Sequence, residues 1–194
     1  MRNPPSGEPT ANLAAELIDR LGRLMRAEGH DGRLNPAQWD ALRYLLRCNR
    51  FSNTPGALAR YLSATKGTAS QTLNALERKG LIARKPDAES GRVVRLTVTA
   101  TGRALAAKDP LQQLTNAAAE LTPTQRSALT VGLSAMLRRL QHDNGLRPFG
   151  VCRTCRHFRP DAPGGKPHWC ALLLDPLSEQ DSAAICVEHE PRAA

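Results

Sequence analysis

The sequence has few aromatic residues and no long apolar run. Phe, Trp and Tyr make up 4% of the 194 residues, so a core must be built from Leu, Ala, Val and Ile. No stretch approaches the roughly 20 apolar residues of a membrane span. The polar segment 1–9 lacks the apolar centre of a secretory signal. These absences predict a cytoplasmic protein without membrane contact, whose thiols stay reduced.

Acidic residues are also scarce, with 18 Asp and Glu against 27 Lys and Arg and a net charge of +9. The basic excess lies in the middle of the chain. Residues 54–103 contain nine Lys or Arg and three Asp or Glu, whereas the six basic and six acidic residues from 146 onward balance. A basic segment of this kind favours a polyanionic partner such as nucleic acid.

Most of the chain has the spacing of amphipathic helices. Apolar residues recur in steps of three and four from Asn12, and again after Thr122-Pro123. Asn35-Pro36 and Thr54-Pro55 each place a capping side chain before a proline suited to the first helical position. We predict a mainly α fold with a small β-hairpin: a flexible arm (1–11), a helical domain (12–145) and a cysteine-rich tail (146–194).

Two short helices and a hairpin form the basic segment. A helix over 54–62, a tight turn and a helix over 66–79 closed by Gly80 have the form of a helix-turn-helix. Along the second helix Ala69, Leu73 and Leu76 would face the core. Strands at 81–85 and 93–98 would follow it, joined by a basic loop carrying Arg92.

The opposite face of the second helix carries side chains that reach base edges and phosphates. We therefore predict DNA contacts from this face, with Arg92 on the DNA backbone or in the minor groove. The predicted DNA-binding residues are Lys66, Thr68, Ser70, Gln71, Asn74 and Arg92.

The stretch TPGALARYLSATKGTASQTLNALERKGLIARKPDAESGRVVRLTVTATGRAL resembles the core of MarR-family regulators. It contains LERKGLIAR at 76–84, an acid-to-arginine wing from Asp87 to Arg92, and an L-T followed by T-G at 96–102. The resemblance covers roughly residues 12–144. It implies a winged helix-turn-helix fold and a homodimeric repressor that binds a palindromic operator in double-stranded DNA. It also implies a pocket for a small-molecule inducer between the dimer helices and the DNA-binding lobe.

Two features qualify this resemblance. The family's wing usually has a second acid two residues before its arginine, and Ser90 stands at that position here. The leucines of the first and last helices are candidates for the dimer seam, but a core within one chain would show the same stripe. These leucines are Leu13, Leu17, Leu21, Leu133, Leu137 and Leu140.

Four of the five cysteines lie in the tail, as Cys152, Cys155, Cys170 and Cys186. A Cys-x-x-Cys pair followed by two further cysteines supplies four thiolates for a metal. A tail of this length cannot bury much hydrophobic core, so a bound metal would help to stabilise its fold. His157, His168 and His189 each lie within three residues of a cysteine, so spacing does not rank them as substitute ligands. Cys48 is expected to be a packed apolar residue.

The identity of the centre stays open at this point. Both Zn²⁺ and an iron–sulfur cluster accept four cysteines, and the dispersed single cysteines favour the cluster slightly over a zinc ribbon. Reactive thiols that act as a redox switch are the other alternative.

We therefore expect a transcriptional regulator rather than an enzyme, whose tail site responds to redox or metal state. One rival is a structural zinc, with sensing by a small ligand elsewhere. Another is a thiol or electron-transfer protein that uses Cys152 and Cys155, although the βαβ setting usual for that chemistry is missing.

Overall fold

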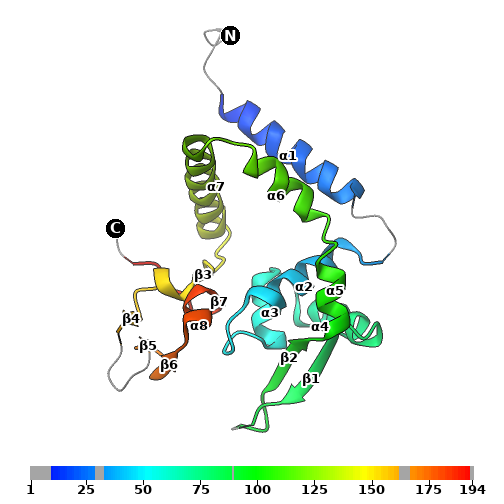
Figure 1. The fold of residues 1–194 in the computed structure, drawn as a ribbon, viewed down its shortest axis with the longest axis vertical. Coiled ribbons are helices and arrows are strands. Elements are labelled where there is room, and N and C mark those ends of the chain that lie inside the picture. Colours follow the sequence, from blue (N-terminus) through cyan, green and yellow to red (C-terminus); the bar gives the residue numbers. More distant parts are fainter. Residues whose placement is uncertain (1–9, 29–32, 89, 162–166, 193–194) are drawn as a thin grey trace.

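Helices dominate the computed structural model, which describes residues 10–28, 33–88, 90–161 and 167–192 (Figure 1). The helices are α1 (Ala11–Glu28), α2 (Pro36–Arg47), α3 (Pro55–Tyr61), α4 (Lys66–Arg78), α5 (Ala100–Ala106), α6 (Leu111–Ala119), α7 (Pro123–Asp143) and α8 (Glu179–Ala183). The strands are β1 (Ile82–Pro86), β2 (Val94–Val98), β3 (Gly150–Val151), β4 (Phe158–Pro160), β5 (His168–Cys170), β6 (Asp175–Leu177) and β7 (Ile185–Cys186). A 3₁₀ turn spans Cys152–Thr154. Most of the predicted arm, residues 1–9, lies outside the described residues.

The predicted helix starts are confirmed by their capping bonds. The side chains of Asn35, Thr54 and Thr122 each accept a hydrogen bond from the backbone three residues on, and a proline follows each of them. Thr99 caps α5 in the same way, and a break at 109–110 separates α5 from α6 as predicted. Gly80 ends the α4 segment with φ of +67°, a conformation that favours glycine.

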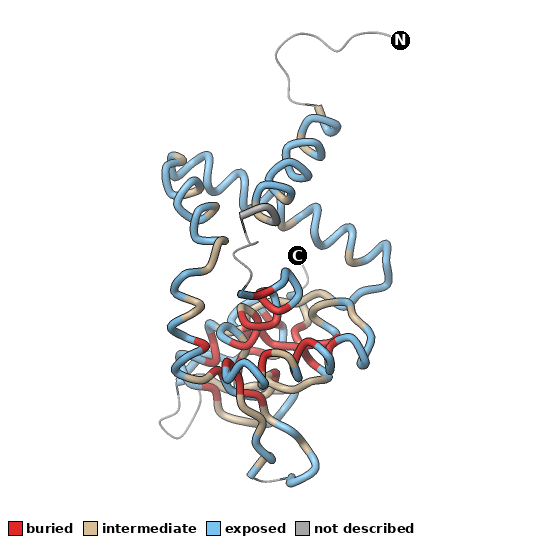
Figure 2. Tube along the Cα trace, turned by 90° about the vertical axis from the view of Figure 1, so that its right-hand side faces the viewer, coloured by how far each residue is buried: buried red, intermediate tan, exposed pale blue. Residues whose placement is uncertain are grey.

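Helices α2, α3 and α4 enclose the main core, and the β1–β2 hairpin closes it. The hairpin is antiparallel, with Ile82 opposite Val98 and Pro86 opposite Val94. Leu42, Leu58 and Leu73 are fully buried at the centre of this core. Figure 2 shows the buried residues gathered in this part of the molecule. The order helix, turn, helix, hairpin is the predicted winged helix-turn-helix.

Helices α1, α6 and α7 extend away from that core, at the end opposite the hairpin (Figure 1). Every described side chain of these three helices is at least partly exposed (Figure 2). The six leucines expected at a dimer seam are 42–58% exposed. The alternative of a core within one chain is therefore wrong for this stripe. Among the described residues, no helix is both long and apolar enough to cross a membrane.

The tail folds into two small antiparallel sheets and packs on the winged helix of its own chain. One sheet pairs β3 with β7, and the other has the order β4-β5-β6. Side chains alternate along β7 and the residue after it: Ile185 and Val187 enter the main core, whereas Cys186 enters a second cluster with Cys152 and Cys155. Strand β7 of the tail therefore contributes side chains to both cores.

The glycine of the L-T…T-G motif is required by close packing. A Cβ at Gly102 would lie 2.2 Å from the backbone oxygen of Leu81 and 2.7 Å from Val98 Cγ1. We expect Gly102→Ala to lower the free energy of unfolding by about 1–3 kcal/mol, because a backbone oxygen cannot move aside easily. Gly56→Ala is the matched control, since a Cβ there meets nothing within 4 Å. Urea unfolding of both variants at one protein concentration measures the difference, and equal stabilities would contradict the packing argument.

Candidate functional site

Helix α4 presents one polar face to solvent. Ala69, Leu73 and Leu76 are buried in the core, which confirms the predicted inner face. All five residues predicted on the outer face are exposed, namely Lys66, Thr68, Ser70, Gln71 and Asn74. The fold therefore displays these side chains together along one helix, as groove binding requires.

Two residues of this face are already held by neighbouring side chains. Thr68 Oγ1 lies 2.9 Å from the hydroxyl of the N-cap Thr65. Asn74 Oδ1 accepts a hydrogen bond of 2.8 Å from Arg84 of β1, which also pairs with Glu77. These bonds orient the two side chains before any ligand arrives, which lowers the entropy cost of binding.

The loop between β1 and β2 is organised by an aspartate and an arginine that the sequence did not single out as a pair. Asp87 accepts bonds from the backbone N–H of Ser90 at 3.0 Å and from Arg95 Nε at 2.5 Å. Arg92 is exposed in the same loop. Ser90, which stands where the family usually has a second acid, contacts Asp87 through its backbone N–H. An alternating hairpin pattern places Asp87 and Arg95 on the two strands' sides of the loop, but does not show that they pair.

Sequence reasoning also missed the α2–α3 loop, Cys48–Asn53. Asn49 and Ser52 are 2% and 0% exposed, which is unusual for polar loop residues. Ser52 Oγ accepts a bond of 2.9 Å from Val187 N, its carbonyl accepts one of 2.8 Å from the Tyr44 hydroxyl, and Asn49 N donates to Ile185 O at 2.9 Å. The buried polar groups are thus satisfied by the tail, whose position no local pattern reveals.

The four predicted tail cysteines line one small cavity. Cys152, Cys155 and Cys186 are each 6% exposed, and Cys170 is half-buried. Apolar side chains form much of the remaining wall, including Phe158, Leu172, Leu173 and Leu177. Cys48 lies apart, packed against the main core, where burial raises the pKa of its thiol to about 12. The structure therefore separates one inert cysteine from four that face a common space.

Hydrogen bonds from N–H groups reach the sulfurs of this cluster. Asn49 Nδ2 donates to Cys152 Sγ at 3.2 Å, and the backbone N–H of Glu190 donates to Cys155 Sγ at 3.4 Å. The free thiols of Cys152 and Cys186 also share a hydrogen bond, which raises the pKa of Cys152 and lowers the pKa of Cys186. Such donors stabilise a thiolate. Nevertheless, no group of three or more His, Cys, Asp or Glu side chains in the described part of the chain is placed to hold a metal ion.

The three tail histidines have different surroundings. His157 lines the cysteine cavity and lies 3.4 Å from Glu190. His168 Nε2 lies 3.1 Å from Glu179, and the buried His189 Nε2 bonds to the Thr154 hydroxyl at 2.9 Å. Of the three, His157 is therefore the one placed beside the sulfurs.

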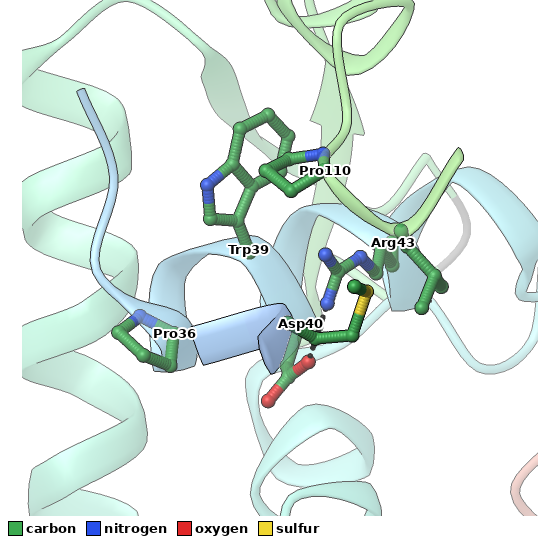
Figure 3. Close-up of a pocket in the computed structure, with 7 residues that line it drawn as sticks. Pro36, Trp39, Asp40, Arg43 and Pro110 are labelled. Atoms are coloured by element: carbon green, nitrogen blue, oxygen red, sulfur yellow. Dashed lines mark hydrogen bonds and ion pairs between the residues drawn. The ribbon is translucent and has the colours of Figure 1, made fainter. Parts of the chain in front are cut away.

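A separate pocket lies between the winged helix and the extended helices (Figure 3). It has a volume of about 240 Å³ and is lined by Met25, Pro36, Trp39, Asp40, Arg43, Pro110 and Leu111. Arg43 binds both carboxylate oxygens of Asp109, which holds the α5–α6 junction on α2. The Trp39 indole N–H is buried and has no hydrogen-bond partner among the described residues. The pocket is thus lined by an ion-paired arginine and by mainly apolar side chains.

Comparison with known proteins agrees with the fold and the predicted family. A family model described as "MarR family" matches residues 34–93, so the chain contains a MarR-family domain there. Two solved structures of Staphylococcus aureus MepR are 24% identical to this chain. MepR in its DNA-binding conformation has a TM-score of 0.58 and covers 66% of this chain and 98% of its own. The MepR–DNA complex has a TM-score of 0.55 and covers 70% and 100%.

A third structure, of MepR as a regulator of a multidrug efflux pump, has 24% identity and a TM-score of 0.52, and covers 68% of this chain and 99% of its own. Comparison with curated proteins gave no match. At this level of identity the solved structures establish the winged-helix fold with its flanking helices.

Proposed function

We propose that the protein is a cytoplasmic transcriptional repressor, not an enzyme, which binds a palindromic operator in double-stranded DNA as a homodimer. The observation that carries this proposal is the exposed polar face of α4 beside an exposed basic wing, within a MarR-family domain. The likeness to MepR, which is described in complex with DNA, agrees with it. Exposed cations surround the face and supply phosphate contacts. They include Arg60, Lys66, Arg78, Lys79, Lys85, Arg92 and Arg103.

The second copy of the chain is proposed to cover α1 and α7. A soluble monomer rarely exposes many large apolar side chains on neighbouring elements, and these helices expose eleven of them at 39–65%. Two recognition helices in one dimer double the DNA contacts and fix a half-site spacing of about 34 Å. Burial of the leucine stripes therefore serves both stability and sequence specificity.

Replacing a seam leucine by a charge tests this dimer. Leu17→Asp and Leu137→Asp are expected to shift the molecular mass from that of a dimer to that of a monomer, because a carboxylate would be buried without a partner. Leu174→Asp is the matched control, since Leu174 is 72% exposed in the tail. Sedimentation equilibrium measures the mass. A monomeric wild type at micromolar concentration would disprove the dimer.

The DNA-binding residues are tested with a duplex enriched from a random library by the wild-type protein. Lys66→Ala and Arg92→Ala are each expected to weaken binding and to reduce the slope of log affinity against log salt by about 1, because each removes one phosphate contact. Gln71→Ala is expected to relax preference at one base pair, at a cost of about 1–3 kcal/mol.

Lys108→Ala is the control for these variants, because Lys108 is an exposed cation outside α4 and the wing. Binding isotherms at several salt concentrations give the affinity and the salt slope of each variant. The same isotherms on duplexes with single base-pair changes give the base preference. Unchanged affinity in both Lys66→Ala and Arg92→Ala would overturn the assignment of helix and wing.

The tail is proposed to hold a thiolate-bound metal centre on Cys152, Cys155, Cys170 and Cys186. Support comes from the shared cavity, the burial of three cysteines and the N–H donors on their sulfurs. Zinc and an iron–sulfur cluster both accept four cysteines. The close pair Cys152 and Cys155 is followed by two single cysteines, so an iron–sulfur centre is favoured slightly and zinc is the alternative.

Anaerobic purification with analysis of iron, acid-labile sulfide and zinc tests this centre. We expect a coloured protein that contains iron and sulfide, and loss of both in Cys152→Ser/Cys186→Ser, because a cluster lacking two ligands is not retained. Cys48→Ser is the matched control and should retain the metal, since Cys48 packs apart from the cavity. A colourless protein with zinc would support the structural alternative, and a metal-free protein with a folded tail would contradict both.

A small-ligand inducer is the second candidate for the signal. The pocket beside Trp39 supports it, because mainly apolar walls with a few charged groups are the usual lining of a small-molecule site. The pocket lies where α2 meets Met25 of α1 and the α5–α6 junction, so an occupant would touch both the DNA-binding domain and the proposed dimer helices. The thiol-enzyme alternative gains no such support, since Cys152 and Cys155 face the closed cavity.

A further inference from the structure

We propose that the α2–α3 loop connects the cysteine cluster to the wing, so that loading of the cluster raises the affinity for DNA. This inference rests on the proposed function, since it supplies the regulation of that DNA-binding surface. The loop is Cys48–Asn53, and it lies between the tail and β2. The same short run of residues contacts the tail on one side and β2 on the other.

The side of the loop toward the tail is anchored to the cluster and its surroundings. The Asn49 amide donates to Cys152 Sγ at 3.2 Å, and the Phe51 ring packs against the cluster. Arg50 binds Asp175 at 2.8 Å and also pairs with Asp181, which lie on either side of α8's start. Three consecutive loop residues thus contact the tail. The first of them, Asn49, bonds directly to Cys152, a proposed metal ligand.

The side of the loop toward the wing is held by one arginine. Arg95 Nη1 of β2 donates to the carbonyls of Arg50 and Phe51, at 2.8 and 3.2 Å, and to Asn53 Oδ1 at 3.2 Å. The Nε of the same guanidinium donates to Asp87, the acid that organises the wing. The backbone bond from Leu96 N to Asn53 O, at 2.7 Å, runs beside it.

The two sets of contacts give a continuous route from sulfur to wing. A bound metal would fix Cys152 Sγ in one place, and with it the 3.2 Å bond that the Asn49 amide donates to that sulfur. A fixed Asn49 holds the Arg50 and Phe51 carbonyls, and these hold Arg95 with its aspartate. Emptying the cluster loosens this chain of bonds, so the wing loses the geometry that places Arg92 on DNA.

Because coupling between two sites is reciprocal, it can be measured either at the DNA-binding surface or at the metal centre. Allosteric couplings are commonly about 5- to 150-fold in affinity. We expect the metal-loaded full chain to bind the enriched duplex at least about 5-fold more tightly than chain stripped by a chelator under reducing conditions. In turn, bound duplex should slow metal loss to the chelator.

Arg95→Gln and Asn49→Ala break the route at its two ends, and in each the ratio of loaded to stripped affinity should fall to near 1. Lys66→Gln is the matched control: it also removes an exposed cation of the proposed DNA-binding surface, but it lies on α4 outside the loop and the wing, so it should weaken both states equally and keep the ratio. Hydrogen exchange without DNA gives a second readout that does not depend on binding. Stripping should speed exchange in residues 48–53 and 94–98 of the wild type, and leave α4 unchanged.

The outcomes separate this inference from the function on which it rests. Equal affinities in the two wild-type states, or tighter binding by the stripped state, overturn the coupling while DNA binding and metal content stand. A ratio that survives in both Arg95→Gln and Asn49→Ala overturns the route. A wild type that contains no metal, or that binds no duplex, overturns the proposed function and this inference together.

Discussion

The burial of two polar side chains in the α2–α3 loop is the constraint on which much of the structure depends. Asn49 and Ser52 are almost entirely removed from solvent, and a buried polar group without a partner costs about 1–3 kcal/mol. The Asn49 amide donates to Cys152 Sγ and the Ser52 hydroxyl accepts from Val187 N, both in the tail. Asn49 Oδ1 accepts from Phe51 N within the loop itself. The winged helix therefore needs the tail to satisfy its own loop, and the tail needs the loop to complete the surroundings of its sulfurs.

This dependence changes how the cysteine-rich segment is understood. Residues 146–194 have the composition of an appendage, but Ile185 and Val187 belong to the main core and Phe149 packs against it. Arg60 of α3 also pairs with Glu188 at 2.9 Å. The segment is thus packed into the domain that carries α4, and the cysteine cluster lies directly beside that domain's core.

Local sequence signals predicted most of the fold and, within the site, the exposed polar face of α4. Capping residues before proline gave the helix starts, and the spacing of Ala69, Leu73 and Leu76 gave both the buried and the exposed face of α4. The pairing of Asp87 with Arg95, and the contacts of Asn49 and Ser52, could not be predicted in this way. They join residues that are adjacent only after the hairpin and tail have docked, and their polar residue types are equally typical of an exposed loop. The cysteine spacing predicted a common site, but not its connection to the loop.

The alternation of β7 sets a limit on how independently the tail site and the DNA-binding domain can behave. Cys186 lies between Ile185 and Val187, and the three side chains enter two different cores because successive residues of a strand point to opposite faces. Full burial of such an apolar side chain contributes about 1.5–3 kcal/mol. A displacement of Cys186 large enough to release a metal would therefore also disturb two residues of the winged-helix core. The proposed metal centre would therefore be linked to the order of the winged-helix core through this strand, in addition to the loop, and the two links would act in the same direction.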